Sequence, residues 1–276
     1  MITAQDINKL RQQTGAGMMD CKKALTEAGG DFDQAIEILR KKGQKVSAAR
    51  ADRATTEGAV WAKTNEQANY GVMIALSCET DFVAKNEMFQ QLGQAALEAA
   101  FTHQPATTEA LLKLEVAGLS LQEKITELVG KIGEKVTISA YATLNSDTVA
   151  AYIHLGSKLG VLVGLKGSQG PQVSKAARDV AMQVAAMNPL AVDKEGIDTT
   201  IVAQELAIAK EQARNEGKPE AMLDKIAQGR LNKFFKEHTL LNQPFVKNNE
   251  MTIAQYLASV APNLTVTAFE RMAVAS

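Results

Sequence analysis

The segment Tyr70-Gly71-Val72-Met73-Ile74-Ala75-Leu76-Ser77-Cys78 is short, apolar and rich in residues that favour β-strands. It therefore predicts a strand. After it, apolar residues recur at the spacing of one helix face: Met88, Phe89, Leu92, Ala96 and Ala99. The chain passes from a strand to a helix within a few residues, and Thr80 and Asp81 lie at the predicted N-cap of that helix.

The junction between this strand and helix reads Thr80-Asp81-Phe82-Val83-Ala84-Lys85-Asn86. In one interpretation Asp81 caps the helix, and Phe82 is a core residue of its first turn, on the same face as Phe89. In the other interpretation the acidic and aromatic side chains reach into another molecule. Periodicity alone favours the first interpretation.

Two further strands are predicted at residues 59–63 and 136–141. They lie on either side of the first strand and its helix in the sequence. Together these elements predict a compact α+β unit over residues 57–144.

A weak internal repeat follows this unit. Strand-like segments at residues 149–154 and 159–165 precede an alanine-rich helix over residues 173–187, which Asn188-Pro189 closes. The order strand, strand, helix therefore occurs twice. We expect a second, related α+β subdomain over residues 145–276, and an overall fold class of α+β.

The N-terminal region predicts a small module of three short helices over residues 1–43. Thr3 and Asp6 have capping-box spacing at the first helix, and the glycines of Thr14-Gly15-Ala16-Gly17 break it. The second helix is expected over residues 18–28, and the third ends at Gly43. Residues 44–56 are then a polar linker.

Met18 and Met19 follow the glycine loop of this module directly. Adjacent side chains on a helix cannot both face a thin core. In one interpretation one methionine fills a gap in the core. In the other the pair forms a docking patch, because methionine adapts to partner surfaces.

A helical hairpin is predicted at about residues 198–238, inserted in the second subdomain. In the first half, spacings of four and three alternate between the apolar residues Val202, Leu206, Ala209 and Ala213, and a second helix provides the matching residues Leu223, Ala227, Leu231 and Phe234. Gly217-Lys218-Pro219 makes the turn, with proline expected at the first position of the second helix. This pattern predicts an antiparallel coiled coil that projects into water. The segment 243–246 then returns to the second core.

Composition describes a protein of 276 residues with balanced charge, since 30 basic and 31 acidic residues leave a net charge of −1. A general nucleic-acid binder needs a strongly basic face, and the basic cluster at residues 40–45 with Arg50 and Arg53 is interpreted as a solvated helix end. Two distant cysteines, Cys21 and Cys78, argue against a disulfide framework. No apolar run has the length of a membrane span, so we expect a cytoplasmic protein without membrane or nucleic-acid partners.

Sequence motifs of enzymes are missing. No P-loop occurs, the three histidines lack metal-ligand spacing, and no serine lies in a nucleophile-elbow context. We therefore expect no cofactor, no metal and no catalytic residue. His154 lies at a predicted strand end before a glycine, where it is either a structural histidine or part of a partner surface.

Several of these segments resemble the bacterial elongation factor Ts family. The resemblance rests on Leu10-Arg11, the block from Thr14 to Leu25, the block from Thr80 to Asn86, His154 to Val163, and Asn242 to Val246. It extends over nearly the whole chain. It implies an N-terminal module of the ubiquitin-associated type, and a protein that is not an enzyme but exchanges GDP for GTP on elongation factor Tu, in its GDP-bound and nucleotide-free states.

The resemblance also implies the residues that contact this partner. Three groups are expected: Thr80, Asp81, Phe82 and Val83 beside the magnesium and phosphate site of the GTPase; Leu10, Arg11, Gly15, Gly17, Met18 and Met19 in docking; and His154 and Gly156 in the second subdomain.

Two other classes of function remain open from the residues alone. A non-exchanging adaptor would use the small module and the coiled coil to recruit partners. An enzyme would assemble its site from dispersed residues, and no recognisable constellation supports it.

Overall fold

Strand β2 (Tyr70–Cys78) is buried along its whole length in the computed structural model, which describes residues 2–274. It is the central strand of an antiparallel sheet with the order β1-β2-β5, between β1 (Glu57–Thr64) and β5 (Val136–Asn145). One face of β2 packs under helices, and the other packs on a second sheet. Covering on both faces explains why its apolar run is nearly continuous rather than alternating.

The second sheet has the order β10-β7-β6 and is also antiparallel. It consists of β6 (Thr148–Ile153), β7 (Leu159–Lys166) and β10 (Thr265–Ala273). The two sheets share a core of buried side chains that includes Met73 and Leu162. Glycine permits their close approach, because a Cβ on Gly71 would lie 2.8 Å from Cγ1 of Val149.

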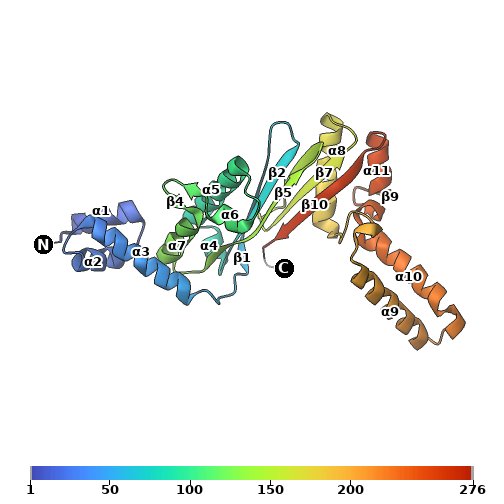
Figure 1. The fold of residues 1–276 in the computed structure, drawn as a ribbon, viewed down its shortest axis with the longest axis horizontal. Helices are drawn as coiled ribbons and strands as arrows, with labels where there is room; N and C mark the ends of the chain where they lie inside the picture. Colours follow the sequence, from blue (N-terminus) through green and yellow to red (C-terminus); the bar gives the residue numbers. More distant parts are fainter. Residues whose placement is uncertain (1, 275–276) are drawn as a thin grey trace.

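Helices cover the outer face of each sheet (Figure 1). On the first sheet these are α5 (Glu87–His103) and α7 (Leu121–Ile132); α6 (Thr108–Leu112) and the small hairpin of β3 (Glu115–Val116) and β4 (Leu119–Ser120) connect them. On the second sheet they are α8 (Pro171–Met187) and α11 (Ile253–Val260). The α+β class and the repeated order of strand, strand, helix are confirmed. The subdomain boundaries stay predictions.

The N-terminal module contains α1 (Ala4–Thr14), α2 (Met18–Glu27) and α3 (Phe32–Ala49). The capping box of Thr3 and Asp6 is confirmed at the start of α1. The expected end of the third helix at Gly43 is wrong, because α3 continues to Ala49 and includes part of the expected linker. Gly43 is buried within α3 against Gly130 of α7, so this glycine serves helix packing and not helix termination.

The hairpin helices are α9 (Thr199–Asn215) and α10 (Leu223–His238), which lie side by side and project from the second sheet (Figure 1). Gly217 has a φ of 75° at the turn. Pro219 does not begin α10, because a 3-10 turn, η2 (Glu220–Met222), comes between them. The shared apolar face buries Ala209, Ala213, Leu223, Ala227 and Leu231.

Buried polar side chains hold the base of the hairpin. Gln183 of α8 donates to the side chain of Gln243 at 3.2 Å and to the carbonyl of Pro244 at 3.1 Å, and accepts from the amide of Val246 at 2.9 Å. Phe245 is buried and stacks on Tyr256, with ring centroids 4.4 Å apart, so the chain returns to the second core as predicted. The remaining elements here are η1 (Lys194–Gly196), η3 (Leu240–Asn242), β8 (Pro244–Phe245) and β9 (Asn248–Thr252).

Within residues 2–274, helices long and apolar enough to cross a bilayer do not occur.

Gly93 of α5 faces the ring of Trp61, and a Cβ there would lie 2.7 Å from the ring atom Cε2. We expect Gly93→Ala to lower the free energy of unfolding by about 1–3 kcal/mol, because overpacking a filled core costs that much. Trp61 is the only tryptophan, so its fluorescence emission follows unfolding by denaturant and gives the free energy of unfolding of each variant. The control is Gly229→Ala in α10, where the added methyl meets nothing within 4 Å and helix propensity improves. Equal stability of Gly93→Ala and the unmodified protein would contradict this packing.

Candidate functional site

The turn after β2 is a separate one-turn helix, α4 (Asp81–Ala84). Thr80 is its N-cap, as predicted, but the helix ends at Lys85, and Asn86 caps α5 anew by accepting from the amide of Met88 at 2.9 Å. Phe82 therefore does not continue the face of Phe89. Phe89 is buried whereas Phe82 is 82% exposed, so the interpretation of Phe82 as a core residue is wrong.

Glu134, which follows α7, holds this turn from beneath. Its carboxylate accepts from the amide of Thr80 at 3.0 Å and from the Thr80 hydroxyl at 2.9 Å. Val83 is buried in the core of the first sheet, so its side chain faces inward, and its contact with a partner stays a prediction. Sequence reasoning missed Glu134, because it is far from Thr80 in the chain and no local pattern marks it.

Glu79 ties the same turn to α3. Its carboxylate accepts from the Arg50 guanidinium at 2.8 Å and from the backbone amide of Lys135 at 2.7 Å. The Lys135 amide and then the Arg50 cation hold the pKa of Glu79 below its usual value. Arg50 is therefore engaged in the structure and is not simply part of a solvated basic cluster.

Asp81 forms an ion pair with Lys85, with Nζ 2.8 Å from Oδ2. The hydrogen bond from Lys85 lowers the pKa of Asp81, and the charge of Lys158 adds to this effect. Asp81 is thus an ionised, solvent-facing carboxylate beside an exposed aromatic ring. Cys78, just before the turn, is buried, and burial with the charge of Glu134 raises the pKa of its thiol to about 12.

The loop between β6 and β7 presents a second exposed apolar residue. Leu155 is 91% exposed, between His154 and Gly156, where Gly156 has a φ of 84°. His154 is exposed, and its Nδ1 lies 2.9 Å from the Tyr152 hydroxyl, so it is not a buried core histidine. Sequence reasoning passed over Leu155, although an apolar residue in a predicted loop is a signal of exposure.

The Leu155 loop and α4 lie at the same end of the paired sheets. The carbonyl of Ser157 accepts from the amide of Val60 at 2.7 Å, and Lys158 pairs with Glu57 at 2.6 Å. Glu57 is opposite Cys78 in the β1-β2 ladder, directly before the Phe82 turn. The structure therefore brings together the residues expected at the magnesium site and in the second subdomain.

The methionines of the N-terminal module are both exposed, Met18 by 48% and Met19 by 64%, at the start of α2. The interpretation in which one fills the core is wrong. Leu10 is fully buried in the core of the module, so its side chain faces inward, and its part in docking stays a prediction. The other expected docking residues frame α2: Arg11 is exposed near the end of α1, Gly15 ends α1 with a φ of 68°, and Gly17 caps α2.

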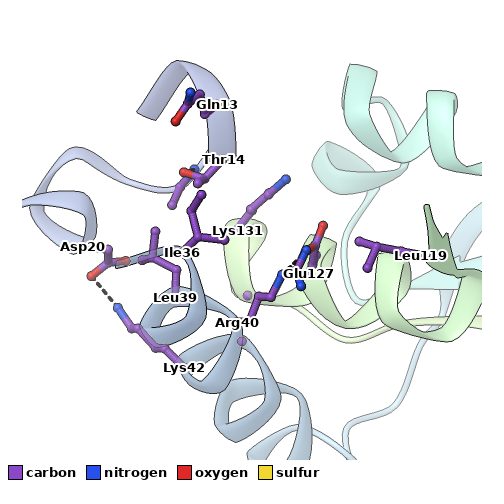
Figure 2. Close-up of a pocket in the computed structure, with 13 residues that line it drawn as sticks. Gln13, Thr14, Asp20, Ile36, Leu39, Arg40, Lys42, Leu119, Glu127 and Lys131 are labelled. Atoms are coloured by element: carbon purple, nitrogen blue, oxygen red, sulfur yellow. Dashed lines mark hydrogen bonds and ion pairs between the residues drawn. The ribbon is translucent and has the colours of Figure 1, made fainter. Parts of the chain in front are cut away.

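The structure does not bring Met18 and Met19 together with Phe82, because α2 and α4 lie in different parts of the molecule (Figure 1). Between them is a cleft of about 270 Å³, which α3 and α7 line with Ile36, Leu39, Glu127 and Lys131 (Figure 2). Arg40 spans the cleft to Glu127, with Nε 3.3 Å from Oε1. Sequence patterns did not indicate this cleft, since it depends on how α3 packs.

Among the residues that the structure describes, acidic, histidine and cysteine side chains form no group suited to hold a metal ion. The site is thus two exposed apolar surfaces: the Phe82 surface, made by Phe82 and Leu155 with Asp81 and His154, and the methionine surface, made by Met18 and Met19. Such surfaces with polar rims are typical of protein interfaces.

Comparison with known proteins is consistent over the whole length. The family model described as Elongation factor TS matches residues 79–276, a range that includes the Phe82 turn. Elongation factor Ts of Amoebophilus asiaticus is 64% identical over 273 residues, covering 99% of this chain and 99% of that protein. The proteins of the same name from Cytophaga hutchinsonii and Christiangramia forsetii are 55% and 52% identical over 274 residues, covering 99% of this chain and 99% and 98% of theirs. The chain therefore belongs to the elongation factor Ts family.

Proposed function

We propose that this protein promotes the exchange of GDP for GTP on elongation factor Tu, the GTPase that carries aminoacyl-tRNA to the ribosome. Membership of the elongation factor Ts family supports the role. The observation that carries it is Phe82, an aromatic ring 82% exposed on a turn that Glu134 and Glu79 hold in place. A rigid, exposed aromatic side chain is typical of an interface hot spot.

In the proposed mechanism, Phe82 inserts between side chains of the GTPase beside its magnesium and phosphate site. Magnesium bridges protein oxygens and nucleotide phosphates, so displacing the elements that support it weakens the neutralisation of phosphate charge. Asp81 brings a carboxylate to the same place, where its negative charge disfavours the phosphates. Binding of the factor and of the nucleotide are then mutually weakening, so that GTP entry releases the factor.

Several contacts must share this work. Accelerating GDP release about 10⁴-fold requires roughly 5.5 kcal/mol of barrier lowering, which exceeds what one contact usually supplies. Leu155 and His154 extend the Phe82 surface, and the methionine surface would dock on a helix of the GTPase. Thioether side chains adapt to such a helix face. The partner is bound in its GDP-bound and nucleotide-free states, in the cytoplasm, without a cofactor or nucleic acid.

The alternative function is that of an adaptor, which would bind elongation factor Tu without changing nucleotide release. Stopped-flow release of a fluorescent GDP analogue, with increasing amounts of this protein, separates the two. A rate that rises to a plateau supports exchange. Binding without acceleration would replace exchange by the adaptor.

We expect Phe82→Ala to lower the plateau rate of GDP release by a factor of about 30, equivalent to at least about 2 kcal/mol for a hot-spot side chain. The control is Ile208→Ala, which shortens an exposed apolar residue on the distant hairpin and should leave the rate unchanged. Asp81→Ala should cost less than Phe82→Ala. An unaltered plateau rate in Phe82→Ala would show that insertion of Phe82 is not part of the mechanism.

We expect the double variant Met18→Ala, Met19→Ala to raise the concentration that gives half-maximal exchange by about tenfold, because two apolar contacts of ~0.7 kcal/mol each are lost. The plateau rate should persist, since the Phe82 turn is untouched. Met222→Ala is the matched control, because Met222 is as exposed as Met18 but lies at the hairpin tip. An unchanged half-maximal concentration would disprove docking through α2.

We expect Glu134→Ala to lower the plateau rate about tenfold, because a misplaced contact group loses much of its effect when its support is removed. The substitution leaves the amide and hydroxyl of Thr80 without their carboxylate partner. Glu66→Ala, at an exposed site of the β1-β2 loop, is the control. If Glu134→Ala and Glu66→Ala exchange equally well, Glu134 does not position Phe82.

A further inference from the structure

Helix α3 belongs to two cores at once. Near its start, Ala35, Ile36 and Leu39 pack within the N-terminal module, while Val46 near its end packs against the core of the first sheet. A helix of 18 residues is about 27 Å long. One continuous helix therefore connects the module that carries Met18 and Met19 to the paired sheets that carry Phe82.

The two helices touch at glycines where α3 meets α7. A Cβ on Gly130 would lie 2.6 Å from the Cα of Gly43, whereas a Cβ on Gly43 would lie 3.6 Å from the Cα of Gly130 and 3.4 Å from the carbonyl oxygen of Thr126. Glycine inside a helix costs about 1 kcal/mol relative to alanine, and here both helices carry one. The close backbone contact offsets that cost.

Further contacts fix α3 on both sides of this crossing. Arg40 pairs with Glu127 at 3.3 Å, and the side chain of Lys131 lies 3.5 Å from the Cβ position of Gly15 in the α1-α2 loop. At the other end of α3, Arg50 holds Glu79, which is adjacent to Thr80. The C-terminal end of α3 thus contacts the turn that presents Phe82.

We infer that Gly130 is a positioning residue, whose lack of a Cβ lets α7 touch the backbone of α3 at Gly43 and so fixes the methionine surface relative to the Phe82 surface, so that one partner meets both. This inference rests on the proposed function. Two binding surfaces held at a fixed separation act at a high effective concentration, and less ordering entropy opposes binding. The cleft beside the crossing leaves space into which the module tilts if the contact is lost (Figure 2).

The test variant is Gly130→Ala. Buried side chains of α7, including Leu128 and Val129, anchor that helix in the first core, so the added methyl group displaces α3 and not α7. Gly43→Ala is the matched variant from the same contact, with only ordinary van der Waals distances to its neighbours. Gly229→Ala controls for adding a methyl group to a helix far from the crossing.

We expect Gly130→Ala to raise the half-maximal concentration for exchange about tenfold and leave the plateau rate unchanged, because positioning is lost while the Phe82 turn remains. Gly43→Ala should change the half-maximal concentration by less than about threefold. Gly229→Ala should match the unmodified protein. Thermal unfolding of each variant shows whether it is folded.

The position of the module is measured independently by spin-label distances in the full chain. Labels on Gln12→Cys in α1 and Gln94→Cys in α5 are exposed, whereas the native Cys21 and Cys78 are buried. We expect a narrow distance distribution that Gly130→Ala shifts or broadens and Gly43→Ala largely preserves. This readout does not depend on exchange.

A shifted distance together with a raised half-maximal concentration supports the inference. A broad distribution in the unmodified chain, a distance that Gly130→Ala leaves unchanged, or a shifted distance without weaker binding would each overturn it. If the unmodified protein accelerates no GDP release, the proposed function fails, and the distances still decide whether the glycine contact holds the module.

Discussion

The burial of β2 on both faces is the constraint on which the rest of this structure depends. Helices α5 and α7 cover one face, and the second sheet covers the other. At roughly 25 cal/mol for each Å² of apolar surface removed from water, a strand buried on both sides contributes far more than one with a solvated face. The two sheets cannot separate without exposing Met73 and Leu162 together, so the paired sheets form one body.

Because β2 is buried on both faces, its C-terminal end is fixed in position, and the turn that follows projects from it. An exposed phenylalanine side chain contributes no burial free energy to folding, so contacts elsewhere in the molecule must fix its position. Glu134 and Glu79 do so from below, and both are held in turn by Thr80, Arg50 and the Lys135 amide. The rigidity of the turn is therefore a property of tertiary contacts between α3, the end of α7 and β2, and not of the motif itself.

The sequence was sufficient to predict the elements that bury apolar runs. The strands at β2 and β7, the helix α8, the capping box at Thr3 and the return of Phe245 to the core all follow from local patterns, and each is confirmed. The exposed state of Phe82 could not be predicted from periodicity, because a second N-cap at Asn86 breaks what reads as one helix. Gly43 was misread for a related reason: glycine ends helices and also lets helices touch, and only the partner helix distinguishes the two. Glu134 was missed because its role depends on Thr80, which is distant in the chain, whereas Leu155 was missed although its place in a predicted loop was a local signal of exposure.

Cys78 adds a chemical property to the Phe82 turn. Oxidation and alkylation of cysteine proceed through the thiolate, and burial together with the charge of Glu134 raises the pKa of the Cys78 thiol to about 12, which disfavours the thiolate at neutral pH. Burial beneath β1 and the turn also keeps peroxide and other oxidants from the sulfur. The same negative carboxylate that holds Thr80 thus suppresses the reactivity of the neighbouring thiol. Oxidation of Cys78, which would place a polar group in the core beneath the Phe82 turn, is therefore disfavoured.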